Sequence, residues 1–151
     1  MADPVNSDQQ QRLAADLFNE TWTLMQRDDR GRDDDDRMLN GAHASRYLWG
    51  EVGTPLNRAR GEWQLSRVYC LLARAEPALY HARRCLDQCT GHGISGFDLA
   101  YAHEAMARAH ALAGDREAAA GSRRAAEQQL AAIEDAGDRE LLVADLATVP
   151  V

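Results

Sequence analysis

Two segments decide the fold of this 151-residue chain: LSRVYCLLARAEPALYHARRC, residues 65–85, and MARAHALAGDREAAAGSRRAA, residues 106–126. The second segment repeats the first at an offset of 41 residues. The matched pairs are Leu65 with Met106, Ser66 with Ala107, Arg67 with Arg108, Ala78 with Ala119, Arg83 with Arg124 and Cys85 with Ala126. A fixed offset in a chain with helical periodicity indicates stacked helical hairpins, in which neighbouring units bury one another's apolar faces.

The composition favours helices and argues against nucleic acid as a partner. Hydrophobic residues make up 45% of the chain and are mainly Ala and Leu, which favour helix over sheet, so we predict an all-α protein without strands. All 17 basic residues are Arg, but 24 acidic residues give a formal charge of −7. A chain this acidic lacks the basic surface on which DNA or RNA binding depends.

The N-terminal stretch and the cysteines bear on location. Residues 1–10 are polar and lack the apolar core of a signal peptide, and no run approaches the length of a membrane span. We therefore expect a cytoplasmic protein that does not bind membranes. Three cysteines, an odd number without secretory context, indicate reduced thiols rather than a disulfide framework.

Periodicity and capping signals predict one domain over residues 7–148, after a disordered segment 1–6. Helix starts are indicated by Ser7 with Gln10, by Thr54 before Pro55, by Asp115 and by Asp138. The predicted hairpins are 7–50, 55–89 and 97–134, and a capping helix at 138–147 covers the last one. The seven predicted helices are 7–27, 34–49, 55–73, 76–89, 97–113, 116–133 and 139–147.

The two quoted segments resemble the tetratricopeptide repeat family, in which antiparallel helix pairs stack into a right-handed superhelix. The positions that carry the resemblance are Leu65, Ser66, Tyr69, Ala78 and Cys85 in one hairpin, and Met106, Ala107, Ala119 and Ala126, with the turn Gly114-Asp115, in the next. The offset of 41 is longer than the family's period of about 34 residues. The loop 90–96 is long enough to absorb the difference.

The resemblance implies that the first helix of each hairpin lines a concave peptide-binding groove. On the third helix Arg60, Trp63 and Arg67 share a face that points away from the apolar stripe. The repeat register places nine residues along this groove: Asn19, Trp22, Gln26, Arg60, Trp63, Arg67, Tyr101, Glu104 and Arg108. Arg forks and aromatic rings suit an acidic segment or a peptide carboxylate. The alternative is that the tryptophans pack between helices and the arginines pair with nearby acids.

Two stretches look like ligand sites but have simpler structural interpretations. The stretch GHGISG, residues 91–96, fits the dinucleotide pattern G-x-G-x-x-G, but a helix precedes it where that site needs a strand. We predict a loop between helices. The four carboxylates of residues 33–36 could attract a divalent cation, but they lack the spacing of a calcium loop and fit the start of a helix.

Two clusters of His and other polar residues could support chemistry. His81, Cys85 and Cys89 recur every four residues, with His92 just beyond, as in a zinc site; the packing position of Cys85 favours structural burial. His43 with its neighbours Ser45, Arg46 and Tyr47 could act in acid-base catalysis, but hydrogen bonds between helices explain the cluster more simply.

We therefore predict a non-catalytic interaction module that captures a protein or peptide segment along the first-helix groove, without a cofactor or metal. One alternative is a small enzyme or metal protein that uses His43, His81, Cys85, Cys89 or His103 in a pocket between helices. Another is a homodimer that buries its tryptophan face, because short repeat arrays have exposed apolar surfaces.

Overall fold

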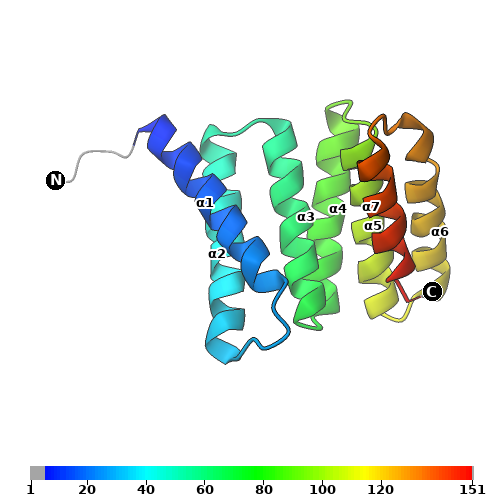
Figure 1. Cartoon of the computed structure of the whole chain (residues 1–151), viewed down its shortest axis with the longest axis horizontal. Coiled ribbons are helices and arrows are strands. Elements are labelled where there is room, and N and C mark those ends of the chain that lie inside the picture. The colour runs from blue at the N-terminus through cyan, green and yellow to red at the C-terminus, as the bar shows by residue number, and fades with distance from the viewer. Residues whose placement is uncertain (1–5, 151) are drawn as a thin grey trace.

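The computed structural model describes residues 6–150; residues 1–5, most of the segment predicted to be disordered, and residue 151 lie outside the described part. Between these limits the chain is all-α and contains no strand, which confirms the predicted fold class (Figure 1). Consecutive helices from α1 to α6 pack against one another, as in a stack of helical hairpins. The elements are α1 (Ser7–Met25), α2 (Arg32–Val52), α3 (Pro55–Leu71), α4 (Ala75–Gly91), α5 (Phe97–Leu112), α6 (Arg116–Glu127), the 3-10 turn η1 (Leu130–Ala132) and α7 (Ala136–Ala147).

The offset of 41 residues is a structural repeat, because the turns α3–α4 and α5–α6 have the same hydrogen bonds. The amide of Arg74 donates to the carbonyl of Tyr69 at 2.9 Å, and the amide of Asp115 donates to the carbonyl of His110 at 3.0 Å. In each turn the preceding residue has a positive φ, 57° at Ala73 and 84° at Gly114. Many helices end in this way, with a residue in the left-handed conformation followed by an amide that bonds back to the last turn.

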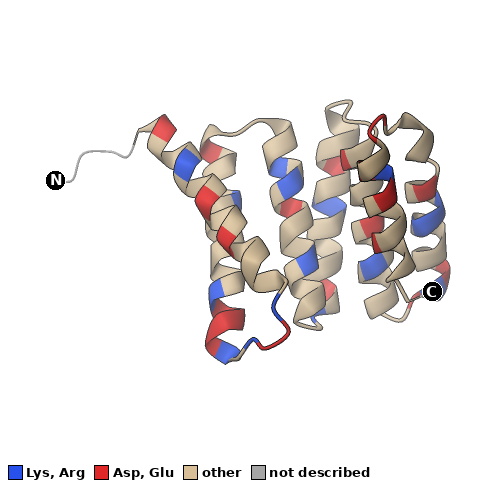
Figure 2. Ribbon diagram, viewed as in Figure 1, with Lys and Arg blue, Asp and Glu red and all other residues tan. Residues whose placement is uncertain are grey.

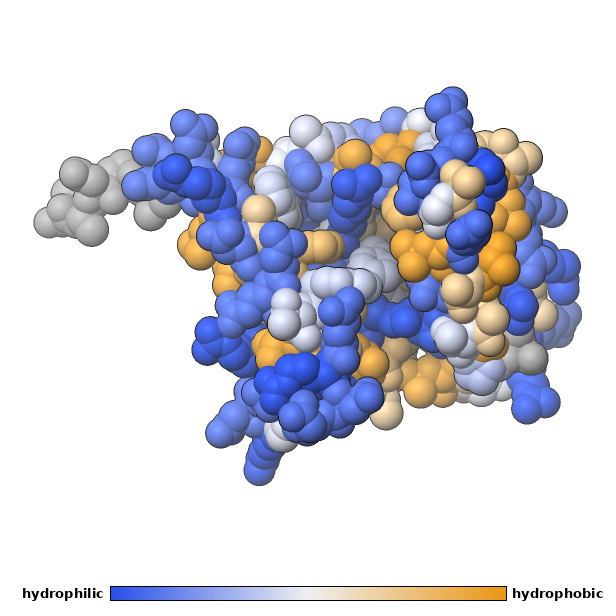
Figure 3. Space-filling view, viewed as in Figure 1, coloured by the Kyte–Doolittle hydropathy of each residue, from blue (hydrophilic) through white to orange (hydrophobic). Residues whose placement is uncertain are grey.

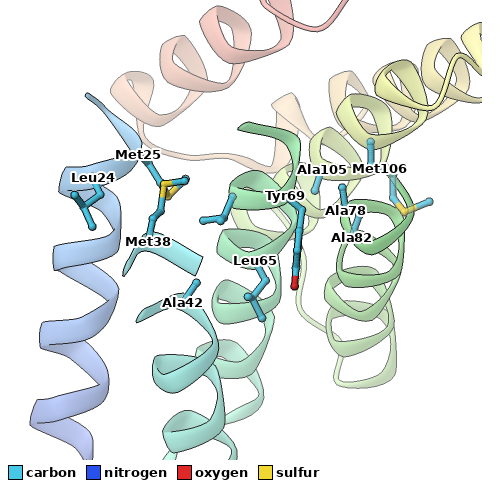
Figure 4. Close-up of a cluster of buried hydrophobic side chains, with 12 residues drawn as sticks. Leu24, Met25, Met38, Ala42, Leu65, Tyr69, Ala78, Ala82, Ala105 and Met106 are labelled. Atoms are coloured by element: carbon cyan, nitrogen blue, oxygen red, sulfur yellow. The ribbon is translucent and has the colours of Figure 1, made fainter. Parts of the chain in front are cut away.

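The core repeats at the same offset. Leu65 and Met106 are buried, as are the small residues at the helix crossings, Ala78 with Ala119 and Cys85 with Ala126. Small side chains there let the two helices of each hairpin approach closely. Figure 4 shows the apolar cluster in which Leu65 of α3 and Met106 of α5 lie together with residues from α1, α2 and α4.

The first hairpin departs from the repeat. The helix α1 ends at Met25, whereas the register set by α3 would carry it to Arg30. The guanidinium of Arg30 instead folds back and donates to the carbonyls of Leu24 and Met25 at 3.2 and 3.3 Å. These hydrogen bonds give partners to carbonyl groups that have none within the last turn of α1. The connection to α2 is therefore longer than the tight turns of the later hairpins.

Two of the four predicted caps are correct and two are displaced. Thr54 and Asp115 cap α3 and α6 as predicted. The first capping box uses Asn6 with Gln9 rather than Ser7 with Gln10, and α7 is capped by Asp135 rather than Asp138. In both cases an equally good capping side chain stands slightly upstream, so α7 begins earlier than predicted. The predicted sixth helix also ends early, at Glu127, before η1.

The helix α7 lies on the face of the stack that α1, α3 and α5 form, which we call the first-helix face. It contacts α5, and Figure 1 shows it in front of that helix. Leu142 and Leu146 pack there with Tyr101 of α5 and Ile133. The helix covers apolar surface of the last hairpin, as predicted, and it covers the side that would be the groove.

The glycine-rich stretch is a connection between helices, as predicted. The helix α4 runs into it and ends at Gly91, and α5 begins at Phe97. Gly96 has a φ of 69°, and a Cβ there would lie 3.1 Å from the carbonyl oxygen of Ala132. The glycine is therefore explained by close packing against η1. No helix within residues 6–150 has both the length and the apolar character needed to cross a membrane.

Candidate functional site

A pocket of about 450 Å³ opens on the first-helix face, between α1, α3, α5 and α7. Figure 3 shows that this face is hollowed between α1 and α7, with an apolar patch on the α7 side. The pocket is lined by Phe18, Asn19, Trp22, Ala59, Arg60, Trp63, Cys85, Phe97, Asp98, Tyr101, Leu141 and Asp145. It is mainly apolar and aromatic, and its polar groups are few.

Aromatic side chains form a continuous row along the pocket. The ring of Trp63 lies 5.9 Å from that of Trp22 on one side and 5.9 Å from that of Tyr101 on the other. Phe97 extends the row, with its ring 4.8 Å from Tyr101. The rings of Trp63 and Tyr101 stand at 90° to each other, an edge-to-face arrangement that aromatic pairs favour. The three first helices thus each contribute at least one ring to the same surface.

The arginines predicted to grip a ligand are bound to acids of this chain. Arg60 makes two hydrogen bonds to the carboxylate of Asp98, at 2.8 and 3.2 Å. Arg67 and Arg108 both donate to one oxygen of Glu104, at 2.9 and 2.7 Å. Figure 2 shows charges of both signs along α3 and α5. The structure therefore has the alternative arrangement, in which these arginines pair with acidic residues of the same chain.

Glu104 is the centre of a buried polar cluster behind the aromatic row. Its side chain is 1% exposed, and its second oxygen accepts a hydrogen bond from the indole of Trp63 at 3.3 Å. A buried carboxylate is stable only when donors replace the lost water, and Arg67, Arg108 and Trp63 supply them. The cluster therefore fixes the orientation of the Trp63 ring in the pocket wall.

The helix α7 is tied to α5 by polar contacts at the edge of the pocket. The hydroxyl of Tyr101 donates to the carboxylate of Asp145 at 2.6 Å. Burial and this hydrogen bond raise the pKa of Tyr101, so the phenol stays protonated and keeps donating. Arg108 donates to the carbonyl of Asp145 at 3.0 Å and to the hydroxyl of Thr148 at 2.8 Å, near the C-terminal end of α7.

The nine predicted groove residues fall into three sets. The pocket lining includes Asn19, Trp22, Arg60, Trp63 and Tyr101. The buried cluster beside it holds Arg67, Glu104 and Arg108. Gln26 is exposed at the end of α1 and lies outside the lining.

Sequence reasoning missed several lining residues, including Phe97, Asp98, Leu141 and Asp145. Phe97 and Asp98 precede Tyr101 by one helical turn, so the register of α5 could have found them. Leu141 and Asp145 come from α7, whose placement on this face depends on long-range packing.

A second polar cluster lies where α2, α3 and α4 meet. Glu62 accepts one hydrogen bond from Arg46 at 2.8 Å and is bonded to His81 at 2.6 Å. Burial acts to raise the pKa of Glu62, but His81 and Arg46 outweigh it and hold the pKa below its usual value. His43 is bonded to the hydroxyl of Tyr69 at 2.8 Å.

These contacts fit the interpretation of His43 and Arg46 as residues that bond between helices. Ser45 fits it too, because its hydroxyl donates to the carbonyl of Ala14 on α1 at 2.7 Å. The sequence did not link Arg46 to Glu62, because the two residues stand on different helices. The described pockets do not open onto this cluster.

The cysteines and histidines do not converge on a metal. Cys85 and Cys89 are buried side by side, and their hydrogen bond together with burial raises the pKa of Cys85, which keeps that thiol protonated. His81 is engaged with Glu62. Within residues 6–150, no group of three or more His, Cys, Asp or Glu side chains has an arrangement that could hold a metal ion.

Comparison of the chain with protein-family models, with curated proteins and with solved structures finds no significant match.

Proposed function

We propose that this protein is a non-catalytic interaction module of the tetratricopeptide-like type, which captures a partner protein segment on its first-helix face. The observation that carries the proposal is the aromatic pocket between α1, α3, α5 and α7. The partner segment lies beside α7, over α1 and α3, and inserts an anchoring side chain into the pocket against Trp22, Trp63 and Tyr101.

The helix α7 supports this proposal, because it is an example of a chain segment that occupies the first-helix face. It buries Leu142 and Leu146 against α5, and it receives hydrogen bonds from Tyr101 and Arg108. Among residues 6–150, no segment covers the continuation of the same face over α3 and α1 in this way. An apolar groove that receives one or two anchors from a helix or strand is a common mode of peptide recognition.

The size and lining of the pocket also suit an anchor. Ligand pockets have volumes of roughly 300 to 1,000 Å³ and are lined mainly by apolar and aromatic side chains. The value here is about 450 Å³, which lies within this range. Trp22 is 41% exposed although it is large and apolar, so a ligand that covers it gains hydrophobic free energy.

The internal ion pairs change the role that the arginines can have. The carboxylates of Asp98 and Glu104 already occupy the forks of Arg60, Arg67 and Arg108. A ligand carboxylate would have to displace them and leave a buried acid without its partners. We therefore assign binding to the aromatic rings and give the arginines the role of holding the wall of the pocket.

The test is a selection of peptides on the full chain from a random displayed library, followed by titration of the enriched peptides. We expect Trp22→Ser to weaken their binding at least about tenfold, as for a central aromatic anchor. The matched control is Tyr47→Ser, because Tyr47 is an exposed aromatic residue on α2 outside the pocket. Equal binding by parent and Trp22→Ser, with helicity intact, would contradict the proposal.

A second copy of the chain is the alternative occupant of the face. Light scattering over a range of concentrations distinguishes it from a partner segment. A dimer that dissociates in Trp22→Ser, but not in Tyr47→Ser, would assign the pocket to self-association instead.

A further inference from the structure

We infer that the anchor taken by the pocket is a basic side chain, lysine or arginine, of the partner segment. This inference rests on the proposed function and names the chemistry of its ligand. It follows from three observations: the charge of the lining, the hydrogen bonds made by the central rings, and the arrangement of those rings around one hollow.

The charged groups of the lining are Arg60, Asp98 and Asp145. Arg60 and Asp98 neutralise each other through two hydrogen bonds. Asp145 accepts from Tyr101 and forms no ion pair with any residue between 6 and 150. The lining therefore carries one net negative charge, and it belongs to Asp145.

The nearby arginines do not reverse this charge at the pocket surface. Arg67 and Arg108 share the carboxylate of Glu104 behind the aromatic row, so this cluster carries one positive charge, but neither arginine belongs to the lining. Arg108 meets Asp145 only at its backbone carbonyl, which leaves the carboxylate unpaired with a cation. A ligand carboxylate in the pocket would be repelled by Asp145, and the cation of the lining, Arg60, is already paired with Asp98.

The central rings are electron-rich because both donate to carboxylates. Trp63 donates its indole proton to Glu104 at 3.3 Å, and Tyr101 donates its phenolic proton to Asp145 at 2.6 Å. A hydrogen bond to an anion shifts electron density into the ring and makes its face more negative. The faces of Trp and Tyr rings attract ammonium and guanidinium groups within about 6 Å of the ring centre.

The rings stand at different inclinations around the same hollow. The planes of Trp22 and Trp63 differ by 40°, and those of Trp63 and Tyr101 by 90°. A compact cation in this hollow is close to more than one ring, with Asp145 at its edge. A neutral apolar side chain would bury the same area but would gain nothing from the carboxylate.

The experiment compares peptides of the form Ac-Gly-Leu-X-Leu-Gly-NH2 on the full chain, where X is Arg, citrulline, Lys, Leu or Glu. Citrulline matches Arg in size and hydrogen-bonding groups but has no charge. We expect the Arg and Lys peptides to bind about threefold to thirtyfold more tightly than the citrulline and Leu peptides, which is the range of one cation–π contact. The Glu peptide should bind most weakly.

The variant Asp145→Asn should reduce the preference for Arg over citrulline to less than twofold, because Asn can still accept from Tyr101 but carries no charge. The control is Glu140→Gln, which removes one exposed charge from the same helix outside this lining. It should leave the preference unchanged.

The binding data distinguish failure of the basic anchor from failure of the proposed function. Equal or tighter binding of the citrulline, Leu or Glu peptide would overturn the basic anchor while leaving the pocket as a binding site. An equal loss of preference in Glu140→Gln and Asp145→Asn would also overturn it, because the effect would then come from overall charge. Binding of none of the five peptides at millimolar concentration would overturn the basic anchor, whereas the proposed function fails only if no displayed peptide binds in a way that depends on Trp22.

Discussion

The hairpins α3–α4 and α5–α6 have the same turn and the same packing positions, yet the outward side of their first helices differs. On α5 this side is covered by α7, which buries Leu142 and Leu146 against it. On α3 the equivalent side is open and forms the wall of the pocket. At equivalent positions the two helices carry Trp63 and Glu104, and these two side chains are bonded to each other.

One helical scaffold therefore carries two kinds of surface, because the sequence changes between the hairpins are confined to a few positions. The turn hydrogen bonds and the small buried residues, such as Ala78 and Ala119, set the stacking and are kept. The residues on the first-helix face vary and decide whether that face is covered or left for a ligand. Glu104 links the two cases, because it holds an arginine of each hairpin.

Removing the carboxylate of Glu104 should destabilise the protein more than any other change considered below. In Glu104→Ala the guanidinium groups of Arg67 and Arg108 lose a carboxylate that is 1% exposed. Loss of one partner of a buried ion pair costs about 3–5 kcal/mol in the free energy of unfolding. Urea denaturation followed by circular dichroism measures the change.

The matched control is Glu127→Ala on α6. Glu127 also pairs with an arginine four residues away, Arg123, but this pair is exposed. Exposed pairs of this kind contribute about 0.3–0.5 kcal/mol. If the two alanine variants lost the same stability, the central role of Glu104 between the hairpins would be wrong.

An effect of intermediate size should come from exchanging the residues of the two repeated turns. Ala73 and Gly114 both have positive φ, where a Cβ costs about 1 kcal/mol or more. We expect Ala73→Gly to stabilise the protein by about 0.5–1 kcal/mol and Gly114→Ala to destabilise it by about 1 kcal/mol. Thermal and urea unfolding would measure both, and changes of the same sign would show that the turns are not equivalent.

The smallest effect is on the pH dependence of the free energy of unfolding. It involves another pair of equivalent positions, Glu62 and His103. Burial lowers the pKa of His103 below 6.5. His103 therefore binds a proton more weakly in the folded chain than in the unfolded chain. Stability from this group is complete above about pH 6.5 and is lost as the pH falls toward the lower folded pKa. The pKa of Glu62 is also lowered, so its contribution is lost at more acidic pH, below its unfolded value.

The variant His103→Gln should therefore lose less stability between pH 7 and pH 5 than the parent chain does. A remaining slope is expected, because burial and the charge of His81 also lower the pKa of His43. Unfolding free energies at several pH values test this, and an unchanged or steeper slope would contradict the assignment.

Local signals made much of the fold predictable. Thr54 before Pro55 fixed the start of α3, and the repeated segments fixed the later turns. The caps at Ser7 and Asp138 were wrong because Asn6 and Asp135 offer equally good side chains nearby. Local sequence does not choose between such neighbours.

The site was only partly predictable, for a physical reason. The repeat register brought Trp22, Trp63 and Tyr101 together correctly, because it reports which helix faces are aligned. The repeat register could not show that α7 lies on α5, or which acid each arginine contacts. The position of α7 and the partners of the arginines depend on the packing of helices that are far apart in the chain.

NMR of the three tryptophan indole groups shows whether ligands bind at the pocket beside α3. Trp22 and Trp63 line the pocket, whereas Trp49 lies on α2 outside the lining and serves as an internal reference. Addition of a peptide selected on the full chain should shift the signals of Trp22 and Trp63 and leave that of Trp49 in place. If a peptide bound while the signals of Trp22 and Trp63 stayed unchanged, the pocket would not be the binding site.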